Sequence, residues 1–272
     1  MKIVAAATAM LLVLPLAPVT AMPPPPSQEK HALEWKPAEK RIVVVKLKSV
    51  TLAFTGKDEM ISHESEAELS PIPGDSPAGQ PYVVRVNRLH LKKRDGETIV
   101  ELKFERDKEP VFEGAEPPRD LKNLARELAG DHRTVISGFG RFEAIQDGNR
   151  VLMVSLGRVD AQLPMMPVAS STTWQTDVRI SFPGAEFTGP LTHAFKKIAK
   201  SDKGKFALIR VTAAEGGKPP GESALKWEGT GEMTYSFEDR LISDFKFKLT
   251  QKDKEGKIVR SLEQEVSITL KP

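Results

Sequence analysis

The chain lacks cysteine altogether. This absence excludes a disulfide framework, a thiol nucleophile, thiolate-ligated metal centres and lipid attachment through an N-terminal cysteine. Aromatic residues are also scarce, because the 272 residues include only three tryptophans and two tyrosines. So few large aromatic side chains make a poor surface for stacking sugars.

Neither sign of charge dominates the sequence. Lysine and arginine together number 40 and aspartate and glutamate 37, with the two signs interspersed. A nucleic-acid-binding surface needs clustered positive charge, so nucleic acid is not an expected partner. The 39% hydrophobic and 28% charged residues are typical of a soluble globular protein.

The first 21 residues have the pattern of a secretory signal peptide. Lys2 precedes an apolar stretch, Ile3–Leu16, and the small-residue exit ends at Ala21. A retained membrane anchor is the alternative, but Pro15 and the lack of a positive stop favour cleavage. We therefore expect a periplasmic or secreted bacterial protein with no integral membrane span after cleavage.

The rest of the chain divides into a linker and one β-rich region. Residues 22–40 contain four consecutive prolines and few large apolar side chains, as in a stiff linker, although the sequence leaves the placement of Trp35 open. Residues 41–272 are expected to form an antiparallel β domain, either as one continuous unit or as two halves that meet near residues 160–170.

Apolar and polar residues alternate along much of this region. In the stretch 174–182, for example, alternate residues are almost all apolar and those between them are all polar. This period of two is typical of antiparallel strands with one face on a core and one in water. Turn-forming pairs at Asp95-Gly96, Asp147-Gly148 and Lys203-Gly204 predict hairpins, including one between 134–145 and 151–156.

Two early strands change phase partway along. Val43, Val45 and Leu47 share one face, whereas Val50, Leu52 and Phe54 lie on the other; Val84 and Val86 give way in the same manner to Leu89 and Leu91. Such a slip predicts a β-bulge, which bends a sheet. The expected fold class is therefore mainly β, a strongly curved antiparallel sheet or half-barrel that wraps around a helix or an internal cavity.

One helix is clearly indicated, at about 119–129. Leu121, Leu124, Ala125 and Leu128 have helical spacing, and Gly130 ends the run. About three turns are too short to be stable alone, so we expect the apolar stripe to lie on the concave face of the sheet. The segment 192–200 fits a helix or a strand, and the hairpin pattern around it favours a strand.

No motif predicts catalysis, a metal or a cofactor. The sequence Ser137-Gly138-Phe139-Gly140 lacks the first glycine of a nucleophile elbow, because residue 135 is valine. The pairs Gly138/Gly140 and Gly229/Gly231 lack the remaining residues of a phosphate loop and instead indicate bulges or close backbone approaches. The carboxylates occupy polar strand positions, where we expect them to stay solvated and ordinary. The histidines have no metal-ligand spacing: His31, His63, His90, His132 and His193.

Two surface features have more than one interpretation. The apolar stretch Leu163–Val168 is either a buried crossover that fills the core or a gate lining an apolar pocket. The lysine clusters 92–94 and 196–205 favour solubility and edge protection, or a weak contact with anionic lipid headgroups. If a ligand pocket exists, the candidate contacts are Met165, Met166, Leu124 and Leu128.

Several short motifs resemble a family of exported bacterial proteins of unknown function. They are Leu128-Ala129-Gly130 at the helix end, Leu163–Val168 followed by Thr173-Trp174, and the glycine-bearing stretch Gly229–Phe237. In architecture alone, the expected fold also resembles periplasmic lipoprotein carriers, whose curved antiparallel sheet holds acyl chains beneath helices. These resemblances imply a compartment and a shape, and no activity.

Three functions follow, in order of preference. The first is non-catalytic binding of a lipid, another apolar or amphipathic ligand, or an envelope component in the concavity. The second is a structural or interaction module that pairs with an envelope protein through a strand edge. The third is an exported hydrolase, for which the sequence identifies no site.

Overall fold

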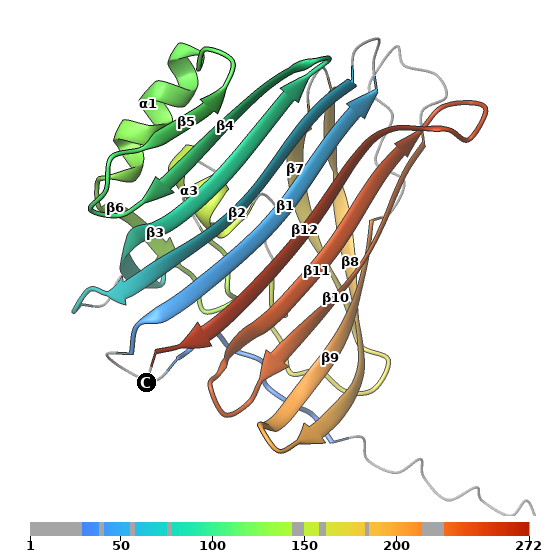
Figure 1. Cartoon of the computed structure of the whole chain (residues 1–272). Helices are drawn as coiled ribbons and strands as arrows, with labels where there is room; N and C mark the ends of the chain where they lie inside the picture. Colours follow the sequence, from blue (N-terminus) through green and yellow to red (C-terminus); the bar gives the residue numbers. More distant parts are fainter. Residues whose placement is uncertain are drawn as a thin grey trace, which may run out of the picture.

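The computed structural model describes residues 29–37, 41–54, 58–74, 78–142, 150–157, 162–182, 185–213 and 226–271. The expected signal peptide and the proline run lie outside these residues. The described chain is dominated by strands, with two helices (Figure 1). The strands are β1 Val43–Phe54, β2 Asp58–Pro71, β3 Gln80–Asp95, β4 Thr98–Glu105, β5 Val111–Gly114, β6 His132–Ile136, β7 Thr173–Phe182, β8 Ala185–Ser201, β9 Gly204–Ala213, β10 Lys226–Ser236, β11 Leu241–Lys252 and β12 Ile258–Leu270, and the helices are α1 Arg119–Leu128 and α3 Arg150–Leu156.

The strands of the described residues form a single antiparallel sheet, which confirms the predicted fold class. Their order is β5-β4-β3-β2-β1-β12-β11-β10-β9-β8-β7, and β6 pairs with β3 beside this path. The two halves of the chain join where β1 pairs with β12, from Val43 opposite Leu270 to Ala53 opposite Arg260. The sheet curves but does not close, so β5 and β7 are its edges (Figure 1).

The concave, inner face of the sheet carries the main core. Alternate residues of the strands are buried there, as their amphipathic patterns predict. Two irregular segments cross this face and add Leu33, Trp35, Leu163 and Val168 to the core. The first of them, residues 29–37, falls within the range predicted as a linker. It is held by Tyr235, whose hydroxyl donates to the backbone oxygen of Glu34 at 2.9 Å.

The bulge predicted in β3 is confirmed. Glu66 of β2 lies opposite Arg88, whereas the next residue, Ala67, lies opposite Val86, so Asn87 is the extra residue. The bulge keeps the apolar residues on both sides of it on the buried face.

The bulge predicted in β1 is wrong. This strand pairs with both neighbours without a break in register. Its inner-facing positions instead change from valine and leucine to Ser49, Thr51 and Ala53, which are all buried. Val50, Leu52 and Phe54 therefore lie on the outer face, so the sequence pattern reflects a change of polarity on a regular strand.

Helix α1 confirms the predicted helix and covers one end of the inner face. Its four predicted apolar residues are buried against β3 and β4 in a second, smaller core. The segment 192–200 is a strand within β8, as expected.

The strand predicted at 151–156 is wrong, because these residues form α3. The buried residues Val151, Leu152, Ser155 and Leu156 have helical spacing. The expected hairpin partner, β6, pairs with β3 instead. A short apolar segment without a strand partner satisfies its backbone hydrogen bonds internally, as a helix.

Candidate functional site

The inner face is only partly covered at β7. Trp174, Thr176 and Val178 point to the inner face, yet they are only half-buried. Farther along the same strand, Ile180 and Phe182 are buried. Because β7 is the last strand of the sheet, its inner face has a neighbouring strand on one side only. This leaves an apolar strip, Trp174–Val178, partly open to solvent.

A polar pair lies at this strip, formed by the half-buried Thr176 and the buried His193. The rings of Trp174 and His193 stack with their centroids 5.2 Å apart and their planes at 8°. The His193 Nε2 atom forms a hydrogen bond with the hydroxyl of Thr176 at 2.9 Å. Burial lowers the pKa of His193 to about 4, so the imidazole is neutral at pH 7.

This pair does not match a nucleophile and its base. A hydroxyl beside an imidazole needs a third group that orients the ring through its other nitrogen. The Nδ1 atom of His193 is buried and has no hydrogen-bond partner among the described residues. The pair instead offers a small polar spot on an apolar strip, which is the composition of many ligand sites.

The segment 162–168, here called the methionine loop, borders the strip. The indole nitrogen of Trp174 donates to the backbone oxygen of Gln162 at 3.0 Å. At the other end of the loop, Val168 exchanges two backbone hydrogen bonds of 2.8 Å with His31. Between these anchors, Met165 and Met166 are 82% and 76% exposed.

The structure places the four predicted ligand contacts in two different environments. Met165 and Met166 are exposed on the methionine loop, whereas Leu124 and Leu128 lie on the buried face of α1. Within the loop, Leu163 and Val168 fill the core, as expected for a buried crossover. The alternative, a gate that lines an apolar pocket, stays a prediction. The role of the four residues in ligand binding stays a prediction.

Sequence reasoning missed the stacked His193 and the open strip. The alternation in 174–182 identified the apolar face of β7 correctly. The register that brings Trp174 opposite His193 and the position of β7 at the edge are properties of the whole sheet. No local signal in the sequence carries that information.

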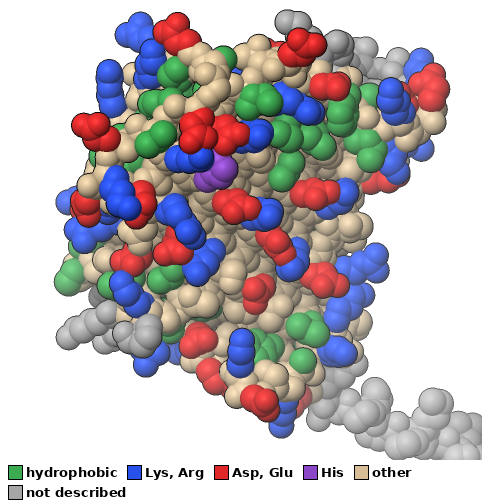
Figure 2. All heavy atoms as spheres, in the orientation of Figure 1, with side chains coloured by type: hydrophobic (Ala, Val, Ile, Leu, Met, Phe, Trp, Pro, Cys, Tyr) green, Lys and Arg blue, Asp and Glu red, His purple; other side chains and the backbone are tan. Residues whose placement is uncertain are grey.

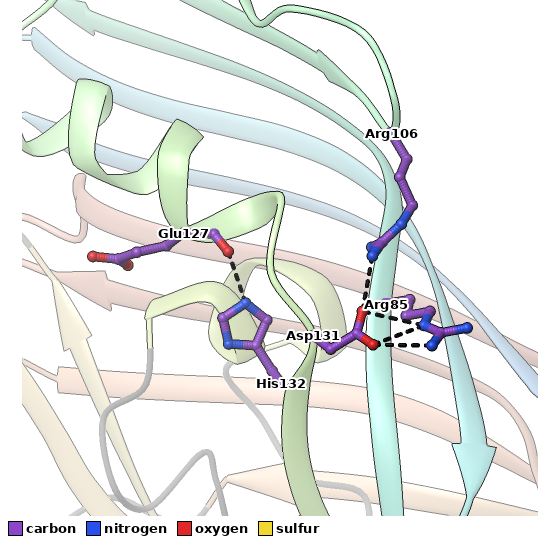
Figure 3. Close-up of polar contacts among 5 residues, drawn as sticks. All are labelled: Arg85, Arg106, Glu127, Asp131 and His132. Atoms are coloured by element: carbon purple, nitrogen blue, oxygen red, sulfur yellow. Dashed lines mark hydrogen bonds and ion pairs between the residues drawn. The ribbon is translucent and has the colours of Figure 1, made fainter.

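A second cluster of polar contacts fastens α1 to the sheet (Figure 3). Asp131, which follows the helix, accepts hydrogen bonds of 2.9–3.1 Å from Arg85 and one of 2.8 Å from Arg106. The Arg85 guanidinium beside Asp131 holds the pKa of that carboxyl below its usual range. His132 Nε2 also contacts the Glu127 backbone oxygen at 2.9 Å. These charges are paired with one another, so the cluster has a positioning role.

The outer face of the sheet carries cross-strand ion pairs (Figure 2). A hollow of about 730 Å³ on this face is lined by Glu64, His90 and Lys103 among others. Its carboxylate Glu64 does not suit general-acid catalysis, which needs a raised pKa. Hydrogen bonding to Lys48 lowers the pKa of Glu64, and hydrogen bonding to Lys92 and His90 lowers that of Glu101. Other ion pairs of this face are Lys46–Glu66, Lys246–Glu265 and Lys248–Glu263.

Two kinds of feature are absent from the described residues. No three side chains of histidine, aspartate or glutamate in them are grouped as metal ligands. Neither helix in this part of the chain is long and apolar enough to cross a membrane.

Comparisons with known proteins do not identify a family. No family model matches the chain, and no curated protein matches it. One solved structure that it matches weakly is a candidate outer membrane lipoprotein-sorting protein domain from Vibrio parahaemolyticus. The identity is 8%, the match covers 85% of each chain, and the TM-score is 0.20. Similarity at this level is too low to support a shared fold or function.

Proposed function

We propose that this protein is an exported, non-catalytic binding protein that holds an apolar or amphipathic ligand against the inner face of its sheet, at β7. The observation that carries the proposal is the half-buried strip Trp174–Val178, an apolar inner surface that the described chain covers only in part. The exported location rests on the pattern of residues 1–21.

The chemistry of the strip favours a ligand with a long apolar part. Apolar surface gains about 25 cal/mol for each Å² removed from water, so an acyl chain lying along β7 would be stabilised mainly by burial. The half-buried hydroxyl of Thr176 supplies a polar atom for orienting a ligand, and its hydrogen bond to the fully buried, neutral His193 holds it in place. Neither is charged at pH 7, which favours a weakly polar group at this point over an ionic one.

We expect a charge on this strip to block binding. In the delipidated protein, Val178→Glu should weaken the uptake of a fluorescent fatty acid by roughly 10-fold or more, because ligand burial would desolvate the carboxylate. The matched control is Ile99→Glu, which places the same charge on the exposed outer face. Titration of probe fluorescence, with circular dichroism to verify folding, gives the measurement.

Intrinsic fluorescence offers a second readout. Trp35 and Trp227 are buried, so Trp174 is the half-exposed indole of the three. A ligand on the strip should change the emission of the wild type and leave that of Trp174→Phe nearly constant. Absence of probe uptake by the wild type, or equal losses in Val178→Glu and Ile99→Glu, would contradict the proposal.

One observation favours a second function, strand-edge pairing. β7 is a ten-residue edge strand without proline, and an open edge of this kind can accept a strand from a partner. Crosslinking in envelope extracts separates the two functions. A crosslinked partner together with no lipid bound to the native protein would favour edge pairing over ligand binding.

A further inference from the structure

Two neighbouring loops expose large apolar side chains at the same end of the molecule. Phe139, in the turn after β6, is 36% exposed, and the even more exposed Met165 and Met166 lie in the methionine loop. The two loops are held together because the Leu163 N–H donates to the Phe139 oxygen at 2.7 Å. We call Phe139, Met165 and Met166 the apolar tip.

The loops that carry the tip are fixed by hydrogen bonds and prolines. The Ser137 hydroxyl accepts from the N–H groups of Phe139 and Arg141 at 3.3 and 3.2 Å. Pro164 and Pro167 flank the methionine pair and restrict its backbone. The tip therefore exists before any partner binds, which lowers the entropy cost of docking.

Unpaired positive charges stand next to the tip. The Trp35 N–H donates to the Gly138 oxygen at 2.7 Å, so Lys36 lies beside the turn that holds Phe139. Lys36 and Arg141 are exposed, and neither forms an ion pair within the described part of the chain. The nearest acidic residue along this segment, Glu34, is already held by Arg240 at 2.9 Å. This contrasts with the outer face, where many lysines are paired.

More lysines reach the same end through packed aromatic rings. The His31 ring, bonded through its backbone to the methionine loop, lies 5.8 Å from the ring of Phe237. The Lys205 ammonium lies 5.0 Å above that Phe237 ring. Lys200 is directly opposite Lys205 on the neighbouring strand. Cations from three separate segments thus lie toward this end, together with the carboxylate of Glu238, which accepts the Lys205 N–H at 2.8 Å.

We propose that the apolar tip docks this protein on an anionic lipid bilayer, with Phe139, Met165 and Met166 entering the headgroup region and Lys36 and Arg141 contacting lipid phosphates. Peripheral binding of this type combines buried apolar area with attraction to anionic lipid. The docking proposal uses different residues from the ligand strip and stands without it.

Vesicle binding tests the proposal directly. The protein starting at Met22 is used, because every described element follows residue 28 and the apolar stretch Ile3–Leu16 would itself bind lipid. We expect it to sediment with vesicles of equal phosphatidylglycerol and phosphatidylcholine, and to bind pure phosphatidylcholine more weakly. Salt at ~0.5 M should weaken the binding by screening the charges.

Paired variants separate the two contributions. Met165→Ser with Met166→Ser should lower the partition onto anionic vesicles at least ~10-fold through lost apolar burial. Lys36→Glu with Arg141→Glu should lower it by roughly 20-fold or more, since each basic residue contributes about fivefold. The controls are Val111→Ser, which removes an apolar side chain that is 51% exposed on β5, and Lys254→Glu in the β11–β12 turn.

Three results would overturn the docking proposal. They are an absence of vesicle binding by the wild type, unchanged binding by both the methionine and the charge double variants, and equal losses in these double variants and in the controls. Capture of an envelope protein through the tip, without binding to protein-free vesicles, would also contradict it. Loss of vesicle binding with fatty-acid uptake intact would leave the ligand proposal standing, and the reverse holds equally.

Discussion

His193 is a titratable side chain in an apolar stack, and this placement has a thermodynamic consequence. The ring is buried against Trp174, and its pKa is lowered to about 4 because burial disfavours the charged form. An unfolded histidine has a pKa of about 6.5. Between these two values the unfolded chain binds a proton at this site and the folded chain does not.

Stability should therefore fall as the pH is lowered through this window. Above pH 6.5 the site is neutral in both states and contributes no pH dependence; from 6.5 down to about 4 it destabilises the fold, by about 3 kcal/mol in full. His193→Gln cannot titrate, so its free energy of unfolding should lose less between pH 7 and pH 4.5. Urea titrations at both pH values measure this difference.

The control for this experiment is His90→Gln, which removes a half-exposed histidine from the outer face. It should keep most of the pH dependence of the wild type. Identical pH dependence in His193→Gln and the wild type would show that His193 does not couple to folding.

At the scale of the element, β10 packs closely against its neighbours because Gly229 and Gly231 have no Cβ atom. A Cβ atom on Gly231 would lie 2.3 Å from the backbone oxygen of Lys246 and 3.0 Å from the Phe247 ring. One on Gly229 would lie 2.7 Å from the Cβ of Ala213. The glycines let β11 and its aromatic ring approach β10 closely, as the sequence predicted for this pair.

We expect Gly231→Ala to lower the free energy of unfolding by ~2 kcal/mol or more, because backbone atoms must move to admit the methyl group. Gly138→Ala is the matched control, since nothing lies within 4 Å of its added Cβ. It should change stability by less than about 0.5 kcal/mol. Chemical denaturation measures the free energy of unfolding of both variants. Similar losses in the two would contradict the prediction and show that β10 can move to admit the methyl group.

Elements whose identity depends on local pattern could be predicted, and those that depend on pairing could not. The strand alternation and α1 each have a complete signal within a few residues, whereas the phase change that marks the β3 bulge also occurs in the regular strand β1. The segment 151–156 has an apolar run that suits strand or helix, and only the absence of a pairing partner decides for α3. In β1, Ser49 and Thr51 are buried against the expectation for polar side chains, so the apolar pattern indicated the wrong face. The partly open strip at β7 could not be predicted for a related reason, because the edge position of β7 follows from the order of all the strands.

At the scale of the whole molecule, the pairing of β1 with β12 holds two half-sheets together. β2 to β5 extend from one side of this junction and β11 to β7 from the other. Both halves contribute side chains to the same main core. We therefore expect the described residues to unfold as a single cooperative unit, whose first and last strands are neighbours.

A chain ending at residue 257, without β12, should fail to form this unit. It would expose the inner residues of β1 and β11 and leave two open edges in the middle of the sheet. We expect loss of the cooperative thermal transition and formation of aggregates on gel filtration. The control is a chain lacking only Lys271 and Pro272, which keeps β12 whole. A monomeric, cooperatively unfolding chain without β12 would show that each half is stable alone.

The same junction determines when folding can finish during biosynthesis. β12 leaves the ribosome about 215 residues after β1, which at about 5–20 residues per second is a delay of roughly 10 to 40 s. Throughout that interval the edge of β1 that later pairs with β12 is open, while its other edge can pair with β2. A holding chaperone would cover the open edge until β12 is made, and under the proposed export such slow folding would keep the polypeptide extended for passage through a translocation channel.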